Sequence, residues 1–255
     1  MLKMVKETLT KLCREHNISC KEIPLEKMEF YGSKRYSEEF MLNAMVNLYN
    51  ISQGNIITFG GFSACSKLLG FRQMRRVSND LDCITNIEGF KILYQSFGQE
   101  LFQTSNYKDL FLEYLGLPVS FDIEETHDWK IPDDFFEESI LFSFPIGDLK
   151  SISPEYLIGL KARRSINKKR FYGKDALDTI NILLAPNYKE TLKEINQDKL
   201  SKILRENVPS DYDQIEDYFN FIYSYKDKIK KEESSLLENS LNSLKKNTKK
   251  IYSFS

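Results

Sequence analysis

The spacing of apolar residues predicts helices at the start of the chain. In Leu2–Leu12 and again in Phe40–Leu48, apolar residues recur at helical intervals, with charged or polar residues between them. The polar turn Ser52–Asn55 interrupts this pattern. We therefore expect residues 1 to about 50 to be helical, and we expect the helical structure to end at this turn.

Short strands are expected next, separated by a turn rich in glycine. Ile56–Phe59 has the composition of a buried strand and runs directly into Gly60-Gly61. A helical segment is expected over Ser63–Leu69. A second strand is expected at the end of Ser78–Thr85, and the alternation of apolar and polar residues in Pro118–Ile123 predicts a third.

A mixed segment covers about 87–150, and the chain from Ser153 onward has helical patterns. Ser153-Pro154-Glu155 is a favourable helix start that leads to Lys161, and a further helix is expected from Asp175 to about Leu184. Residues 187–255 alternate Lys and Glu with apolar residues at helical spacing. We predict an α/β (α+β) domain over 1–186, with a small mixed sheet flanked by helices, and a helical bundle over 187–255.

Composition narrows the class of protein. Of the 255 residues, 41% are apolar and 29% charged, with a net charge of −1, so a general nucleic-acid binder is not expected. Four cysteines without C-x-x-C spacing and two histidines argue against a zinc site. We find neither a secretory leader nor an apolar run as long as a membrane span. We expect a cytoplasmic protein that does not enter membranes.

Paired carboxylates after a glycine turn are the strongest candidate chemistry. Gly60-Gly61 alone is typical of any strand-to-helix turn, and an Asp-x-Asp pair alone is common in loops, so their conjunction carries the inference. Glycines let the backbone approach a triphosphate, and N–H groups at a helix start can hold phosphate oxygens. Alternation along a strand would put Asp80 and Asp82 on one face, where carboxylates suit Mg²⁺ or Mn²⁺. Asp122 is the candidate third carboxylate, with an ordinary solvent-facing residue as the alternative.

A basic cluster runs from Lys161 to Lys174. It includes Arg163, Arg164 and the run Lys168–Arg170. Such a cluster is either a solvated helix end or a groove for phosphates. Its position relative to other motifs decides between these interpretations.

The residues Thr58–Gly61 and Arg76–Asp82 resemble the signature of the AbiEii/AbiGii abortive-infection toxins, bacterial proteins with the nucleotidyltransferase fold of the DNA polymerase β superfamily. The usual pattern is a strand, Gly-Gly-Ser/Thr, a short helix, then Arg-x-Ser-x-Asp-Leu/Ile-Asp. Leu160–Arg164 and Lys174–Asp178 match the two later helices of that family. The resemblance covers roughly residues 55–185.

The resemblance implies a role for each matched residue. Asp80 and Asp82 would bind the metal ion, Lys161 would contact the phosphates of an NTP, and Asp175 would lie near the catalytic centre. With Asp122 they form the expected catalytic set. The expected nucleotide-binding residues are Gly60, Gly61, Ser63, Arg76, Ser78, Arg164 and Lys174.

The resemblance leads to an expected function, to which there are two alternatives. The resemblance implies transfer of an NMP from an NTP to a tRNA or protein acceptor, by the toxin of a type IV toxin–antitoxin or phage-defence pair with a cognate antitoxin. Phe62 stands where the family has Ser or Thr, and the interval from Gly61 to Asp80 is long. These departures motivate two alternatives, which are an inactive nucleotide- or RNA-binding relative and an interaction scaffold.

Overall fold

The computed structural model describes residues 11, 13–15, 18, 21–23, 35–71, 78–104, 110–123, 136–167, 171–185, 195–208 and 212–253. By their internal contacts the residues form two compact units. The sheet unit comprises Met1–Ser63 and Ser78–Ile152, and the helical unit comprises Ala64–Val77 and Ser153–Ser255. This division falls at residues 152 and 153, whereas the sequence pattern predicted a boundary near residue 186.

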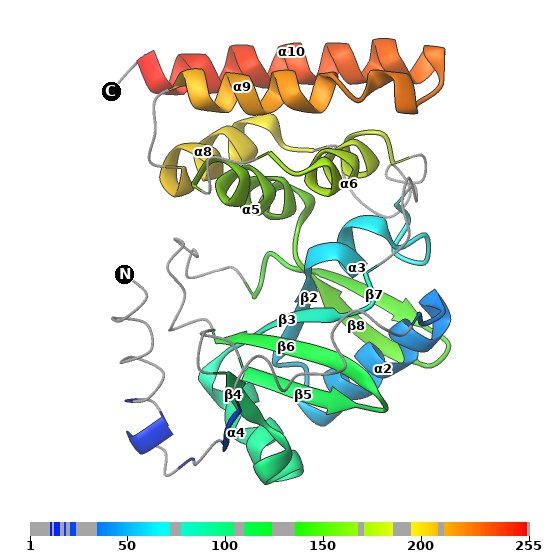
Figure 1. The fold of residues 1–255 in the computed structure, drawn as a ribbon, viewed down its shortest axis with the longest axis vertical. Helices are drawn as coiled ribbons and strands as arrows, with labels where there is room; N and C mark the ends of the chain where they lie inside the picture. Colours follow the sequence, from blue (N-terminus) through cyan, green and yellow to red (C-terminus); the bar gives the residue numbers. More distant parts are fainter. Residues whose placement is uncertain are drawn as a thin grey trace. The chain divides into compact units, whose positions relative to one another are not determined.

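The sheet unit is built on a mixed sheet. Within the described residues it has eight strands, in the order β1-β4-β5-β6-β3-β2-β8-β7 (Figure 1). The strands are β1 (Lys21–Ile23), β2 (Ile56–Phe59), β3 (Leu81–Thr85), β4 (Phe102–Thr104), β5 (Leu110–Tyr114), β6 (Leu117–Ile123), β7 (Ile140–Phe144) and β8 (Gly147–Ser151). The central strand β3 runs antiparallel to β2 and parallel to β6. The expected mixed sheet is confirmed, and it is larger than the sequence predicted.

Helices α2 (Glu38–Ile51) and α4 (Ile87–Phe97) pack against one face of this sheet. The Met45 sulfur of α2 lies 3.6 Å from Cys83 Sγ of β3, which identifies the face to which Cys83 points. Both helices begin at a polar N-cap, since Ser37 Oγ accepts from Phe40 N and Asn86 Oδ1 accepts from Gly89 N. Successive strand residues point to opposite faces, so Asp82 points away from α2.

The helical unit consists of α5 (Pro154–Asn167), α6 (Gly173–Leu183), α8 (Gln197–Asn207), α9 (Tyr212–Tyr223) and α10 (Lys231–Ser253) in its described part. The helices α9 and α10 lie side by side (Figure 1). Helix α8 contacts both α5 and α10. Apolar residues from these helices, such as Leu157, Ile180, Leu204 and Leu241, are buried. Amphipathic helices thus bury their apolar sides against one another, as the helical spacing predicted.

Several elements differ from the expectations. The strand β1 at Lys21–Ile23 lies in a region expected to be helical, because short segments follow their sheet partners more than local spacing. The helix after the glycine turn, α3, spans Gly60–Cys65 instead of Ser63–Leu69. Residues 1–10, where helical spacing was also predicted, lie outside the described part of the chain.

None of the helices in the described part of the chain combines the length and the hydrophobicity needed to span a bilayer.

Candidate functional site

Asp82 lies in the middle of the sheet, on the face opposite helices α2 and α4. In the register of the strands, Asp82 stands beside Phe59 of β2 and Ser120 of β6. The Ser120 hydroxyl donates a hydrogen bond of 3.0 Å to Asp82 Oδ1. Both side chains are partly exposed, and the carboxylate is therefore positioned by the neighbouring strand without being sealed from solvent.

Gly60 lies directly against the other side of the Asp82 carboxylate. Its backbone has φ +71°, a conformation that L side chains rarely adopt. A Cβ atom at this position would lie 2.8 Å from Asp82 Cγ and would overlap Oδ2. Glycine at the end of β2 is therefore required twice, once by the turn and once by the close approach of the Asp82 side chain.

We expect Gly60→Ala to displace the Asp82 carboxylate as well as strain the turn. Gly116→Ala is the matched control, since Gly116 also has positive φ, at +80°, but a Cβ atom there would meet no other atom within 4 Å. Positive φ alone costs about 1 kcal/mol for an L residue. Urea denaturation should show a clearly larger loss of stability for Gly60→Ala than for Gly116→Ala. Equal losses would mean that the Asp82 side chain moves aside freely.

Asp80 and Asp122 lie near Asp82 in sequence and register, respectively. Strand β3 begins at Leu81, so Asp80 lies in the bend directly before it. That Asp80 and Asp82 point to the same side stays a prediction. Asp122 is paired in register with Ile84, which makes it a diagonal neighbour of Asp82 on the same face. Among the described residues, no group of three or more His, Cys, Asp or Glu side chains is close enough to hold a metal ion.

The charge of the two strand carboxylates affects the buried thiol of Cys83. Burial raises the pKa of Cys83 well above its ordinary value, and the negative charges of Asp82 and Asp122 raise it further. Both carboxylates are therefore close enough to this thiol to influence it electrostatically. The thiol is neutral at physiological pH and behaves as a small apolar core group.

The remaining expected nucleotide contacts of the sheet unit have different environments. Ser63 is fully buried, and its Oγ donates to Thr58 Oγ1 at 3.2 Å, so this hydroxyl forms a hydrogen bond inside the core. Gly61 is buried and Ser78 is partly exposed. Arg76, the other residue expected to brace the acidic loop, lies outside the described residues.

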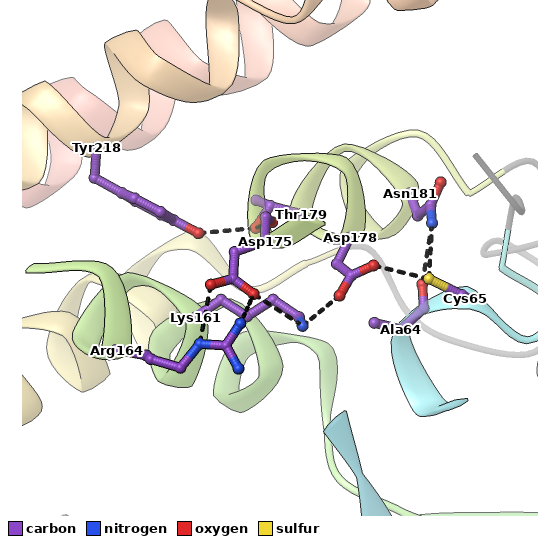
Figure 2. Close-up of polar contacts among 9 residues, drawn as sticks. All are labelled: Ala64, Cys65, Lys161, Arg164, Asp175, Asp178, Thr179, Asn181 and Tyr218. Atoms are coloured by element: carbon purple, nitrogen blue, oxygen red, sulfur yellow. Dashed lines mark hydrogen bonds and ion pairs between the residues drawn. The ribbon is translucent and has the colours of Figure 1, made fainter. Parts of the chain in front are cut away.

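The helical unit contains a network of buried charges, drawn in Figure 2. Lys161 Nζ of α5 lies 2.5 Å from Asp178 Oδ2 and 3.8 Å from Asp175 Oδ1, both on α6. Arg164 binds Asp175 with two N–H groups, Nε at 3.0 Å and Nη2. Both aspartates are fully buried, and Lys161 is nearly so. A nearly buried lysine and an arginine whose side chain is 38% exposed thus balance two fully buried carboxylates.

Further hydrogen bonds fix the far side of this network (Figure 2). The Cys65 thiol donates to Asp178 Oδ1 at 2.8 Å, and Asn181 Nδ2 donates to Cys65 Sγ at 3.3 Å. Asp178 therefore accepts from a lysine on one oxygen and from a thiol on the other. A carboxylate bonded on both oxygens is the arrangement in which a buried charge can be tolerated.

The ring of Tyr218 on α9 adds a neutral polar group at the edge of the network. Its hydroxyl lies 3.0 Å from Thr179 Oγ1. Burial raises the pKa of Tyr218 far above its ordinary value, and the charges of Asp175 and Asp178 act in the same direction. The folded protein therefore keeps this phenol protonated in alkaline solution.

The buried phenol predicts a pH dependence of stability. Above pH about 10 the unfolded chain releases the tyrosine proton while the folded chain retains it, so the free energy of unfolding falls as pH rises. The contribution of Tyr218 is fully present below that pH. Compared with the wild type, Tyr218→Phe should be about 1 kcal/mol less stable at neutral pH, where it lacks the bond to Thr179. Urea denaturation at several pH values should show this difference closing above pH about 10, and a constant difference would contradict the assignment.

The structure brings together only part of the predicted set, and it adds residues that the sequence patterns did not single out. Lys161, Arg164 and Asp175 lie in one network, whereas Lys174 is exposed, and Lys168–Arg170 lie outside the described residues. The added residues are Cys65, Ser120 and Asn181, together with Asp178, which belongs to the matched run Lys174–Asp178 but was given no role there. For two of them the sequence spacing could have indicated a place in the site. Asp178 follows Asp175 by one helical turn, and Ser120 precedes Asp122 by two residues in an alternating strand.

Comparisons with known proteins give little further information. No protein-family model and no curated protein matches the chain. A solved nucleotidyltransferase-like protein from Paracoccidioides brasiliensis is 17% identical, with 68% of this chain and 94% of that chain covered and a TM-score of 0.38. JHP933 from Helicobacter pylori is 13% identical, with 84% and 92% covered and a TM-score of 0.41. Scores this low carry no argument about what this chain does, and its architecture is that of a mixed α/β unit with a C-terminal helical region.

Proposed function

We propose that this protein is a metal-dependent nucleotidyltransferase that moves an NMP from an NTP to an acceptor hydroxyl. The observation that carries the proposal is the contact between Gly60 and Asp82, because it joins in space the glycine turn and the strand carboxylate whose conjunction the sequence pattern singled out. Ser120 holds the same carboxylate from the neighbouring strand. The resemblance of these motifs to the AbiEii/AbiGii toxins supports the reaction class.

The residues around Asp82 fit Mg²⁺ or Mn²⁺ in their chemistry. Asp80 and Asp82 offer only oxygen donors, which both ions prefer, and Mg²⁺ completes its shell with water and substrate phosphates. Asp82 is partly exposed, as a carboxylate that binds a phosphate-bound ion must be. When bound, such an ion supplies neutralisation of negative charge on the transferred phosphoryl group.

The roles of the protein groups follow from the proposed reaction. The acceptor oxygen forms a bond to the α-phosphorus, the bond to the pyrophosphate oxygen breaks, and the acceptor proton passes to Asp122. Asp80 and Asp82 would hold the ion, and Gly60 would allow close approach of the phosphates. Within the helical unit, Asp175 orients Arg164 by accepting its two N–H groups. The proposal also includes the biological role. The acceptor is a tRNA or a protein, the transfer is toxic to the cell, and the protein has a cognate antitoxin.

A second candidate function is nucleotide or RNA binding without turnover. Phe62 favours it, because this ring is fully buried at the position where the related toxins carry a hydroxyl. In this case the carboxylates and the glycine turn would bind a nucleotide but would not support transfer.

Incorporation of label tests the proposal. Each NTP, radiolabelled at the α-phosphate, is incubated with Mg²⁺ or Mn²⁺ and total tRNA or total protein, with Asp80→Ala beside the wild type. Label that appears only with the wild type would establish nucleotidyl transfer and identify both the nucleotide and the class of acceptor. Absence of label, together with metal-dependent NTP binding in calorimetry, would favour the binding function. Absence of both would overturn the proposal and leave an interaction scaffold.

A further inference from the structure

Ser120 of β6 touches the Asp82 carboxylate. Its Oγ donates to Asp82 Oδ1 at 3.0 Å, across two parallel strands that pair Asp82 directly with Ser120. Because the two residues stand opposite each other in the register, the hydrogen bond needs no displacement of either strand. Ser120 and Asp122 share one face of β6, so the donor and the proposed third carboxylate come from the same strand.

The two oxygens of Asp82 have different neighbours. Oδ1 accepts from Ser120, whereas Oδ2 lies over the Cα of Gly60, where a Cβ atom would overlap it. A carboxylate on a short side chain can rotate about χ2, since that torsion is broad. Contacts on both sides restrict this rotation, and the bond from Ser120 uses only one of roughly four lone-pair positions of the carboxylate. The serine therefore orients Asp82 without consuming its capacity to bind a cation.

Strand stability gives no reason for serine at this position. Valine, isoleucine and threonine are favoured in strands, and the residues of β6 next to it, Val119 and Phe121, follow the preference for β-branched and aromatic side chains. Position 120 is partly exposed, so a hydroxyl is not demanded by burial either. What the serine supplies is a small donor that fits beside the Asp82 side chain.

We propose that Ser120 is a positioning residue that holds Asp82 in the orientation in which it binds a divalent cation. This inference rests on the proposed function, since it requires Asp82 to be a ligand of Mg²⁺ or Mn²⁺. Groups that hydrogen-bond to a metal-binding carboxylate fix its orientation, and their loss typically weakens metal binding about 10- to 100-fold. Ser120 itself contacts neither the cation nor the substrate in this arrangement.

Mn²⁺ binding to the 255-residue chain, measured by electron paramagnetic resonance, tests this role. Ser120→Ala should raise the Kd for Mn²⁺ about tenfold or more. Ser120→Thr and Ser120→Val form a matched pair, because both are β-branched and differ only in the hydroxyl group. Threonine should retain affinity close to the wild type, and valine should lose it as alanine does. Ser96→Ala on α4 controls for loss of a hydroxyl elsewhere, since Ser96 is exposed and donates to Ile92 O of its own helix.

The outcomes separate the two proposals. Wild-type binding of Mn²⁺ that disappears in Asp82→Ala, with unchanged affinity in Ser120→Ala and Ser120→Val, would overturn the positioning role alone. Failure of the wild type to bind Mn²⁺, with or without NTP, would overturn the metal assignment of the proposed function and the role of Ser120 with it. Thermal melts of each variant accompany the titrations. If the alanine variant does not fold, the difference between the threonine and valine variants decides the question.

Discussion

Asp82→Ala is expected to abolish nucleotidyl transfer while the protein remains folded. A bound cation contributes several kcal/mol of charge stabilisation in phosphoryl transfer, and each 1.4 kcal/mol is about tenfold in rate. Loss of its main ligand should therefore lower the rate of label incorporation about a thousandfold or more. The Asp82 side chain and the serine that donates to it are both partly exposed, so removal of the carboxylate should change stability little.

Two further variants make this result specific. Asp82→Asn keeps the shape and the acceptor for Ser120 but removes the charge, so it should be nearly as inactive as the alanine variant. Asp148→Asn is the control, because Asp148 is an exposed aspartate on β8 of the same sheet. It should retain wild-type transfer. Wild-type rates in either Asp82 variant would show that Asp82 is not a metal ligand.

Asp178→Ala is expected to destabilise the protein by about 3–5 kcal/mol, the usual effect of removing one partner of a buried ion pair. Asp178 is fully buried and accepts from Lys161 at 2.5 Å and from Cys65 at 2.8 Å. Without it, the carboxylate left near Lys161 among the described residues is that of Asp175 at 3.8 Å, which is already bound to Arg164. Urea denaturation followed by circular dichroism should show the loss in the helical signal.

A surface pair and a double variant provide the controls. Lys91 and Glu88 lie 3.5 Å apart on the exposed side of α4, and Glu88→Ala should cost less than about 0.5 kcal/mol. Replacing both Lys161 and Asp178 by apolar residues should be less destabilising than Asp178→Ala, because the lysine charge is removed together with its partner. A loss for Asp178→Ala as small as that of Glu88→Ala would mean that the buried network does not exist in solution.

The sequence alone determined the elements whose patterns are local. The strands at Ile56–Phe59, Leu81–Thr85 and Leu117–Ile123 were predicted closely, because short runs of β-branched and aromatic residues bounded by polar or glycine turns have few alternatives. The start of α5 at Pro154 followed from the Ser-Pro-Glu signal. Its expected cap is incomplete, since Ser153 Oγ is buried and has no hydrogen-bond partner among the described residues.

Tertiary structure decided which side chains meet. Ser120 reaches Asp82 only because β6 pairs with β3 in one particular register, and a shift of one residue would turn the serine to the other face. Cys65 and Asp178 are 113 positions apart in the chain, and no local pattern predicts their contact. The sequence likewise identified Lys161 as a basic residue but could not show that it is buried between carboxylates. Periodicity records which face of an element is apolar, whereas hydrogen bonds between distant polar groups depend on packing geometry that periodicity does not contain.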